Sequence, residues 1–153
     1  MIVAILAIST CIVGSILMHL YVLRLLWRWA RRHLDRLNGI RLGALVVGCV
    51  LGHVMEIAIF TAGIAAVALS QGNTHLAFEG LDRGRLDLWY YSAAFFTSLG
   101  EKRPHSGELR VFVACETLTG LVLITWTASF LFLLMQRSWP ADAIPPRGAE
   151  SPR

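Results

Sequence analysis

Three ionisable side chains stand within long apolar stretches of the sequence. His53 and Glu56 are three residues apart, and Glu116 is the one charged residue among residues 111–136. On a helix, a spacing of three places His53 and Glu56 on one face. Charged groups are costly inside a membrane and usually mark a functional site or an internal pair. Such groups could relay a proton or a cation beside a cavity, or hydrogen-bond to neighbouring helices.

For Glu116 we favour a structural role, in which its carboxylate accepts a hydrogen bond from a nearby segment. The candidate donors are Tyr90, Ser92 and Thr97. For His53 and Glu56 both roles stay open, since the pair could also tie two helices together. His19 is predicted to be a packed or interfacial histidine. No metal site is predicted, because the pair supplies two ligands and a bundle metal site needs about four.

A second candidate site depends on backbone rather than side chains. Residues 86–97 have the aromatic and small-residue pattern of a short helix, roughly 18 Å long and too short to cross a bilayer. Carbonyl groups that follow such a half-helix can replace the water shell of an ion, and its C-terminal end favours a cation. The residues predicted to line this pore are Thr97, Ser98, Leu99, Gly100 and Glu101. The alternative is an outer loop with an interfacial aromatic helix.

The composition places these candidates in a membrane protein. The chain has 153 residues, of which 56% are hydrophobic and 16% charged, against roughly a quarter charged in a soluble domain. Residues 1–23 carry no charge, residues 42–70 carry only Glu56, and residues 111–136 carry only Glu116. Each stretch exceeds the about 20 residues that span a bilayer. We predict an all-α integral membrane protein with three transmembrane helices and a re-entrant pore helix and loop between the second and third.

Four segments organise the predicted chain. Residues 1–27 form an N-terminal transmembrane helix, residues 28–41 a basic linker, and residues 42–137 the two further spans with the short helix between them. Residues 138–153 contain four prolines and are predicted to be a disordered tail. The helices are expected at residues 2–27, 42–70, 86–98 and 109–137.

The basic linker predicts the orientation. Six arginines and one acid, Asp35, lie between the first two spans, and basic loops favour the cytoplasmic side. The N-terminus is therefore expected outside and the C-terminus inside. Five of these arginines could also contact anionic lipids, and nucleic acid is not predicted as a partner. They are Arg24, Arg28, Arg31, Arg32 and Arg36.

The sequence contains no recognisable catalytic motif. Cys11, Cys49 and Cys115 lie in three different apolar stretches and lack metal-binding spacing, so they are predicted to be packed or lipid-facing thiols. No Gly-rich phosphate loop, nucleophile–base signature or dinucleotide motif is found. We predict no enzymatic activity and no cofactor beyond a permeant ion.

Residues 42–137 resemble the helix–pore loop–helix domain of bacterial potassium-channel-like proteins, in a small subgroup with one extra N-terminal helix. The resemblance lies in Tyr90-Tyr91-Ser92, Phe96-Thr97-Ser98-Leu99-Gly100, the pair His53 and Glu56, Glu116-Thr117-Leu118-Thr119-Gly120, Ile124–Phe130 and Gln136-Arg137. It implies a homotetramer in the bacterial inner membrane that passively conducts K⁺ or another monovalent cation. It also implies a hinge at Gly120, for which close helix packing is the alternative.

The sequence departs from this resemblance where selectivity is built. The expected Tyr-Gly-Asp is replaced by Glu101-Lys102-Arg103, without the glycine that adopts filter backbone angles easily. Each chain adds a net charge of +1 there, and at ~10 Å in bulk water each such charge opposes a cation by about 0.4 kcal/mol. Two hypotheses follow: a cation pore with an atypical filter, or a non-conducting scaffold or regulatory subunit that keeps the fold. A third hypothesis is that the chain is a membrane-embedded metalloprotein.

Overall fold

The computed structural model describes residues 1–32, 39–70, 85–100, 104 and 106–138. These residues form four helices and no β-strand: α1 (Ile2–Arg31), α2 (Gly39–Ser70), α3 (Arg85–Phe96) and α4 (Gly107–Ser138). The predicted all-α class is confirmed.

Three of the helices are long and apolar enough to cross a membrane: α1, α2 and α4. They contain 30, 32 and 32 residues, which corresponds to about 45–48 Å of helix. The prediction of three candidate membrane spans is therefore confirmed. The helix α3 has 12 residues, and it is far too short to span.

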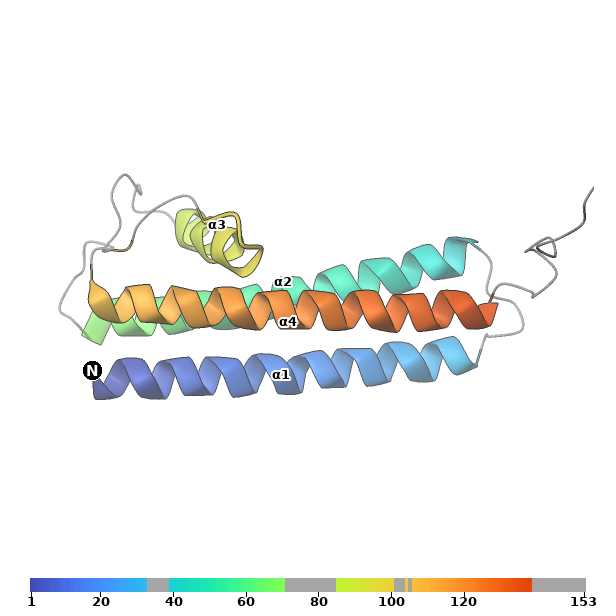
Figure 1. Cartoon of the computed structure of the whole chain (residues 1–153), viewed down its shortest axis with the longest axis horizontal. Helices are drawn as coiled ribbons and strands as arrows, with labels where there is room; N and C mark the ends of the chain where they lie inside the picture. Colours follow the sequence, from blue (N-terminus) through green and yellow to red (C-terminus); the bar gives the residue numbers. More distant parts are fainter. Residues whose placement is uncertain (33–38, 71–84, 101–103, 105, 139–153) are drawn as a thin grey trace, which may run out of the picture.

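The long helices lie side by side, with α2 antiparallel to α1 and α4 (Figure 1). The helix α1 packs against α2 and α4, and α3 packs mainly against the same two helices. In Figure 1, α3 lies over the half of the bundle in which α2 ends and α4 begins. The short helix therefore covers one half of the α2–α4 pair.

Glycines on α2 allow α1 to approach closely. A Cβ atom at Gly48 would lie 2.7 Å from Leu26, and one at Gly52 would lie 3.1 Å from Val22. Two small residues four apart form a flat helix surface that accepts larger side chains from a neighbour, a common mode of packing between membrane helices. The contact ties the N-terminal helix to the rest of the bundle.

An aromatic cluster holds α3 against the long helices. Phe60 of α2, Phe96 of α3 and Phe112 of α4 are all fully buried. The ring of Phe60 lies 6.3 Å from that of Phe96 and 6.1 Å from that of Phe112, in tilted and edge-on arrangements. Such ring geometries are favourable for aromatic pairs. The C-terminal end of α3 is thus anchored in the core, although the helix is short.

The helix ends differ from the sequence prediction by a few residues. The helix α1 continues to Arg31 instead of ending at residue 27, α2 begins at Gly39 instead of 42, and α3 ends at Phe96 instead of 98. Arginine is a good helix former, so the start of the basic segment continues α1. Of the three free cysteines, Cys11 and Cys49 are buried, and the third is half-buried.

Some predictions concern residues outside the described ranges. These are Glu101 in the pore segment, Arg36 in the basic linker, and residues 139–153 of the tail. The remaining lipid-contact candidates lie at the end of α1 and are exposed: Arg24, Arg28, Arg31 and Arg32.

Candidate functional site

The helix α3 ends beside the midpoints of α2 and α4. Its last residue, Phe96, has its ring 5.8 Å from the ring of His53 on α2. A Cβ atom at Gly120 of α4 would collide with the backbone carbonyl oxygen of Phe96. Since His53 and Gly120 lie near the middle of their helices, the C-terminal end of α3 is at half the height of the bundle.

The chain leaves α3 through a Schellman turn. The N–H of Leu99 donates to the carbonyl of Ala94 at 2.7 Å, and the N–H of Ser98 donates to the carbonyl of Phe95 at 3.0 Å. Ser98 has a φ of 66°, in the left-handed position where glycine is usual. A residue with a Cβ atom costs about 1–2 kcal/mol there. Sequence reasoning did not predict this turn.

The turn leaves a row of carbonyl groups available. Thr97, Ser98, Leu99 and Gly100 are all exposed. The hydroxyl of Thr97 donates back to the carbonyl of Ala93 at 2.8 Å. Among the described residues, none donates a hydrogen bond to the carbonyl groups of residues 97–100. These oxygens can therefore coordinate a cation or accept hydrogen bonds from water or another chain.

A buried hydrogen bond joins α3 to α4. The Oγ of Ser92 donates to Oε1 of Glu116 at 2.5 Å and also lies 3.2 Å from the carbonyl oxygen of Ile57 on α2. Ser92 and Glu116 are fully buried. The hydrogen bond expected between Ser92 and Glu116 is present, whereas the hydroxyl of Thr97 is used within its own helix.

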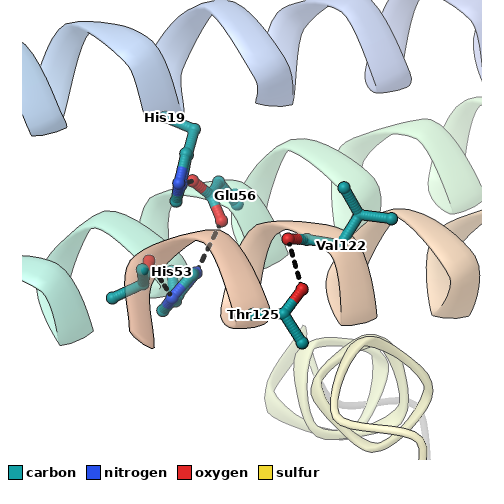
Figure 2. Close-up of polar contacts among 6 residues, drawn as sticks. His19, His53, Glu56, Val122 and Thr125 are labelled. Carbon is teal, nitrogen blue, oxygen red and sulfur yellow. Dashed lines mark hydrogen bonds and ion pairs between the residues drawn. The ribbon is translucent and has the colours of Figure 1, made fainter. Parts of the chain in front are cut away.

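A second polar cluster lies at the middle of the bundle. Nδ1 of His19 on α1 is 2.8 Å from Oε1 of Glu56, and Nδ1 of His53 is 2.7 Å from Oε2 of the same carboxylate. Nε2 of His53 lies 3.1 Å from Oγ1 of Thr127 on α4. Figure 2 shows His19 reaching from α1 to Glu56, with His53 on the other side of the carboxylate. The cluster connects all three long helices.

The structure adds His19 to the pair expected from the sequence. His19 is 3% exposed and Glu56 is fully buried. The two imidazole rings stack with centroids 5.6 Å apart, and the ring of Trp126 lies 5.5 Å from that of His19. The remaining membrane-depth acid, Glu116, pairs with Ser92 and is not part of this cluster.

Thr125 lies near the cluster but does not join it. Its hydroxyl donates to the carbonyl of Val122 at 2.9 Å, within α4 (Figure 2).

The cluster itself brings three candidate ligand atoms together. One nitrogen from each of His19 and His53 and one oxygen of Glu56 all lie within 4.8 Å of one another. These three atoms are suited either to share protons or to hold a metal ion.

The described fold is an all-helical protein with three helices able to span a membrane and a short helix that ends at their midpoint. In comparisons with known proteins, no family model, curated protein or solved structure matches the chain. The resemblance to potassium-channel-like proteins stays a prediction.

Proposed function

We propose that the chain is one subunit of a homotetrameric passive cation pore, in which α3 is a re-entrant pore helix. One observation carries this proposal. The exposed residues 97–100, whose carbonyls accept no hydrogen bond from any described residue, lie at half the height of the helices that can span a membrane. Inside a bilayer, such a backbone must be buried in protein or face water. Four chains around a water-filled axis meet this requirement.

The electrostatics of α3 favour a cation at that axis. The C-terminal end of a helix carries partial negative charge, about half an elementary charge, and Phe96 marks this end. The carbonyls of residues 97–100 then act as ligands that replace the water shell of a K⁺ or other monovalent ion. The chain performs no covalent chemistry in this mechanism, because its role is to position dipoles.

We place the protein in the bacterial plasma membrane, with its N-terminus outside and its C-terminus in the cytoplasm. The exposed arginines at the end of α1 support this orientation through the positive-inside preference. They also offer contacts to anionic lipid headgroups. With this orientation, α3 enters the bilayer from the outer side.

A second candidate function is a non-conducting scaffold or regulatory subunit. It is favoured by the sequence Glu101-Lys102-Arg103 directly after Gly100, which stands where the filter that this segment resembles has Tyr-Gly-Asp and lacks its glycine. In this case the carbonyls of residues 97–100 would be covered by another protein instead of lining a pore.

Restoring the missing filter residues distinguishes the two functions. We expect the triple variant Glu101→Tyr, Lys102→Gly and Arg103→Asp to form a tetramer and to gain K⁺-selective flux in liposomes. The matched control replaces the same three residues with glutamine, which removes the charges without supplying filter geometry. A folded, tetrameric filter variant that gains no flux over this control would favour the scaffold.

A further inference from the structure

We propose that His19, His53 and Glu56 form a binding site for a divalent transition-metal ion of the Zn²⁺ type. The site lies between α1 and α2, with Thr127 of α4 beside it. It is independent of the pore proposed above, because it uses side chains of a different cluster. Sequence reasoning found two of these three donors and therefore predicted no metal site.

The donor set fits such an ion. Two imidazoles and one carboxylate are the ligands of a common class of zinc site that keeps a fourth position open for water or another ligand. Candidate ligand atoms of the three residues lie within 4.8 Å of one another. Around a tetrahedral Zn²⁺ with bonds of 2.0–2.1 Å, ligand atoms are about 3.4 Å apart. The three donors are thus close enough for small side-chain shifts to bring them around one ion.

The burial of the carboxylate also calls for positive charge. Glu56 is fully buried, and a buried carboxylate is costly unless it is paired or bound to a metal. In the part of the chain that the structure describes, the side chains that contact this carboxylate are the imidazoles of His19 and His53 alone. Both are neutral imidazoles when they act as metal ligands. A bound cation would supply the missing charge.

Two further details point to a ligand. Nε2 of His53 is engaged by the hydroxyl of Thr127, and a metal-binding histidine almost always uses its second nitrogen in this way. Nε2 of His19 is buried and has no partner among the described residues. A cluster held together by hydrogen bonds alone therefore leaves one ring nitrogen unsatisfied, whereas a metal site can use it as a ligand.

A metal ion here would act on the bundle rather than on a substrate. It would join α1 to α2 at the level where α3 ends, since the ring of His53 lies 5.8 Å from that of Phe96. Occupancy would then fix the N-terminal helix against the helices that hold α3. We expect Zn²⁺ to raise the unfolding temperature of the protein, and to raise it further as the free Zn²⁺ concentration increases above the dissociation constant.

The first test is a Zn²⁺ titration of the purified full-length protein after chelator treatment. We expect one ion per chain in equilibrium dialysis, with binding weakened at least about 100-fold in His19→Gln and in Glu56→Gln. Thr127→Val, which removes the support for His53, should weaken binding about tenfold to 100-fold. The control Thr125→Val removes a hydroxyl that bonds within α4 and not to the cluster, and it should leave the binding unchanged. No stoichiometric binding to the wild type, or full binding by folded His19→Gln, would overturn the proposal.

X-ray absorption of the Zn²⁺-loaded wild type tests the ligands without any variant. We expect only nitrogen and oxygen neighbours at about 2.0–2.1 Å. A sulfur neighbour at about 2.3 Å would place the ion at a cysteine and contradict the proposed site. Neither measurement depends on ion flux, so an inactive pore would not affect the result.

Discussion

At the scale of single residues, the contact between Ser92 and Glu116 helps to hold α3 against α4. It is a buried hydrogen bond between a short helix and a long one. When one partner of such a bond is removed, the other is left buried without compensation, and this costs more than the bond itself contributes. The stability of the protein should therefore be sensitive to substitution of Ser92, although this side chain is small.

Ser92→Ala should lower the free energy of unfolding by about 1–3 kcal/mol, because Glu116 loses its donor. The measurement is denaturant unfolding in mixed micelles. Ser129→Ala is a matched control, since the hydroxyl of Ser129 is exposed and bonds within its own helix; its effect should stay within about 0.5 kcal/mol. Equal effects of the two substitutions would contradict the structural role of Glu116.

Part of this residue-level picture was predictable. An isolated acid in an apolar span needs a donor, and the sequence placed Ser92 among the few candidates for Glu116. The role of His19 was missed, although a signal existed. In a pair of antiparallel helices, the residue numbers of two contacting residues add up to a nearly constant value. For α1 and α2 this value is 74 or 75. The pairs are Leu26 and Gly48, Val22 and Gly52, His19 and Glu56, and Cys11 and Gly63.

At the scale of elements, Gly120 determines how closely α3 can rest on α4. A Cβ atom at this position would run into the carbonyl oxygen of Phe96 and lie 3.1 Å from its Cγ. The close-packing alternative thus has a direct contact to support it. The hinge role stays a prediction, because a single conformation does not test bending.

Gly120→Ala should destabilise the protein by about 1–3 kcal/mol, the usual cost of an extra methyl group in a packed core. Thermal unfolding in detergent measures this. Gly43→Ala is the control, because a Cβ atom at Gly43 in α2 meets nothing within 4 Å; it should stabilise the helix by about 0.5–1 kcal/mol. If Gly120→Ala kept full stability and changed only channel opening, Gly120 would be a hinge.

The elements themselves were largely predictable, but the end of α3 was not. Long uncharged stretches predict membrane-length helices because few alternatives satisfy the backbone in lipid. The turn at Ser98 was missed because serine carries no signal for a positive φ, and core packing of Phe96 overrides that local preference. The helix therefore ends two residues before the predicted position.

At the scale of the whole molecule, the bundle is asymmetric along its length. The helix α3 occupies the half in which α2 ends and α4 begins (Figure 1), whereas the exposed arginines of α1 lie at the opposite end. If the bundle spans a membrane, these two ends face opposite compartments. The positive-inside preference then assigns the arginine end to the cytoplasm.

Cysteine labelling tests this orientation. In a variant without the three native cysteines, Asn73→Cys should react with a membrane-impermeant maleimide in intact cells, because residue 73 lies in the connection predicted outside. Ser151→Cys, in the predicted cytoplasmic tail, should react only after lysis. The reverse pattern would contradict the orientation.

The most direct measurement of the central claim is ion flux through liposomes that contain the wild-type protein, after its tetrameric state has been checked. Gradients of K⁺, Na⁺ and Cl⁻ are compared in parallel. A passive cation pore predicts K⁺ or Na⁺ flux above that of empty liposomes, with little Cl⁻ flux. An intact tetramer that carries no cation flux would contradict the claim and leave the scaffold as the function.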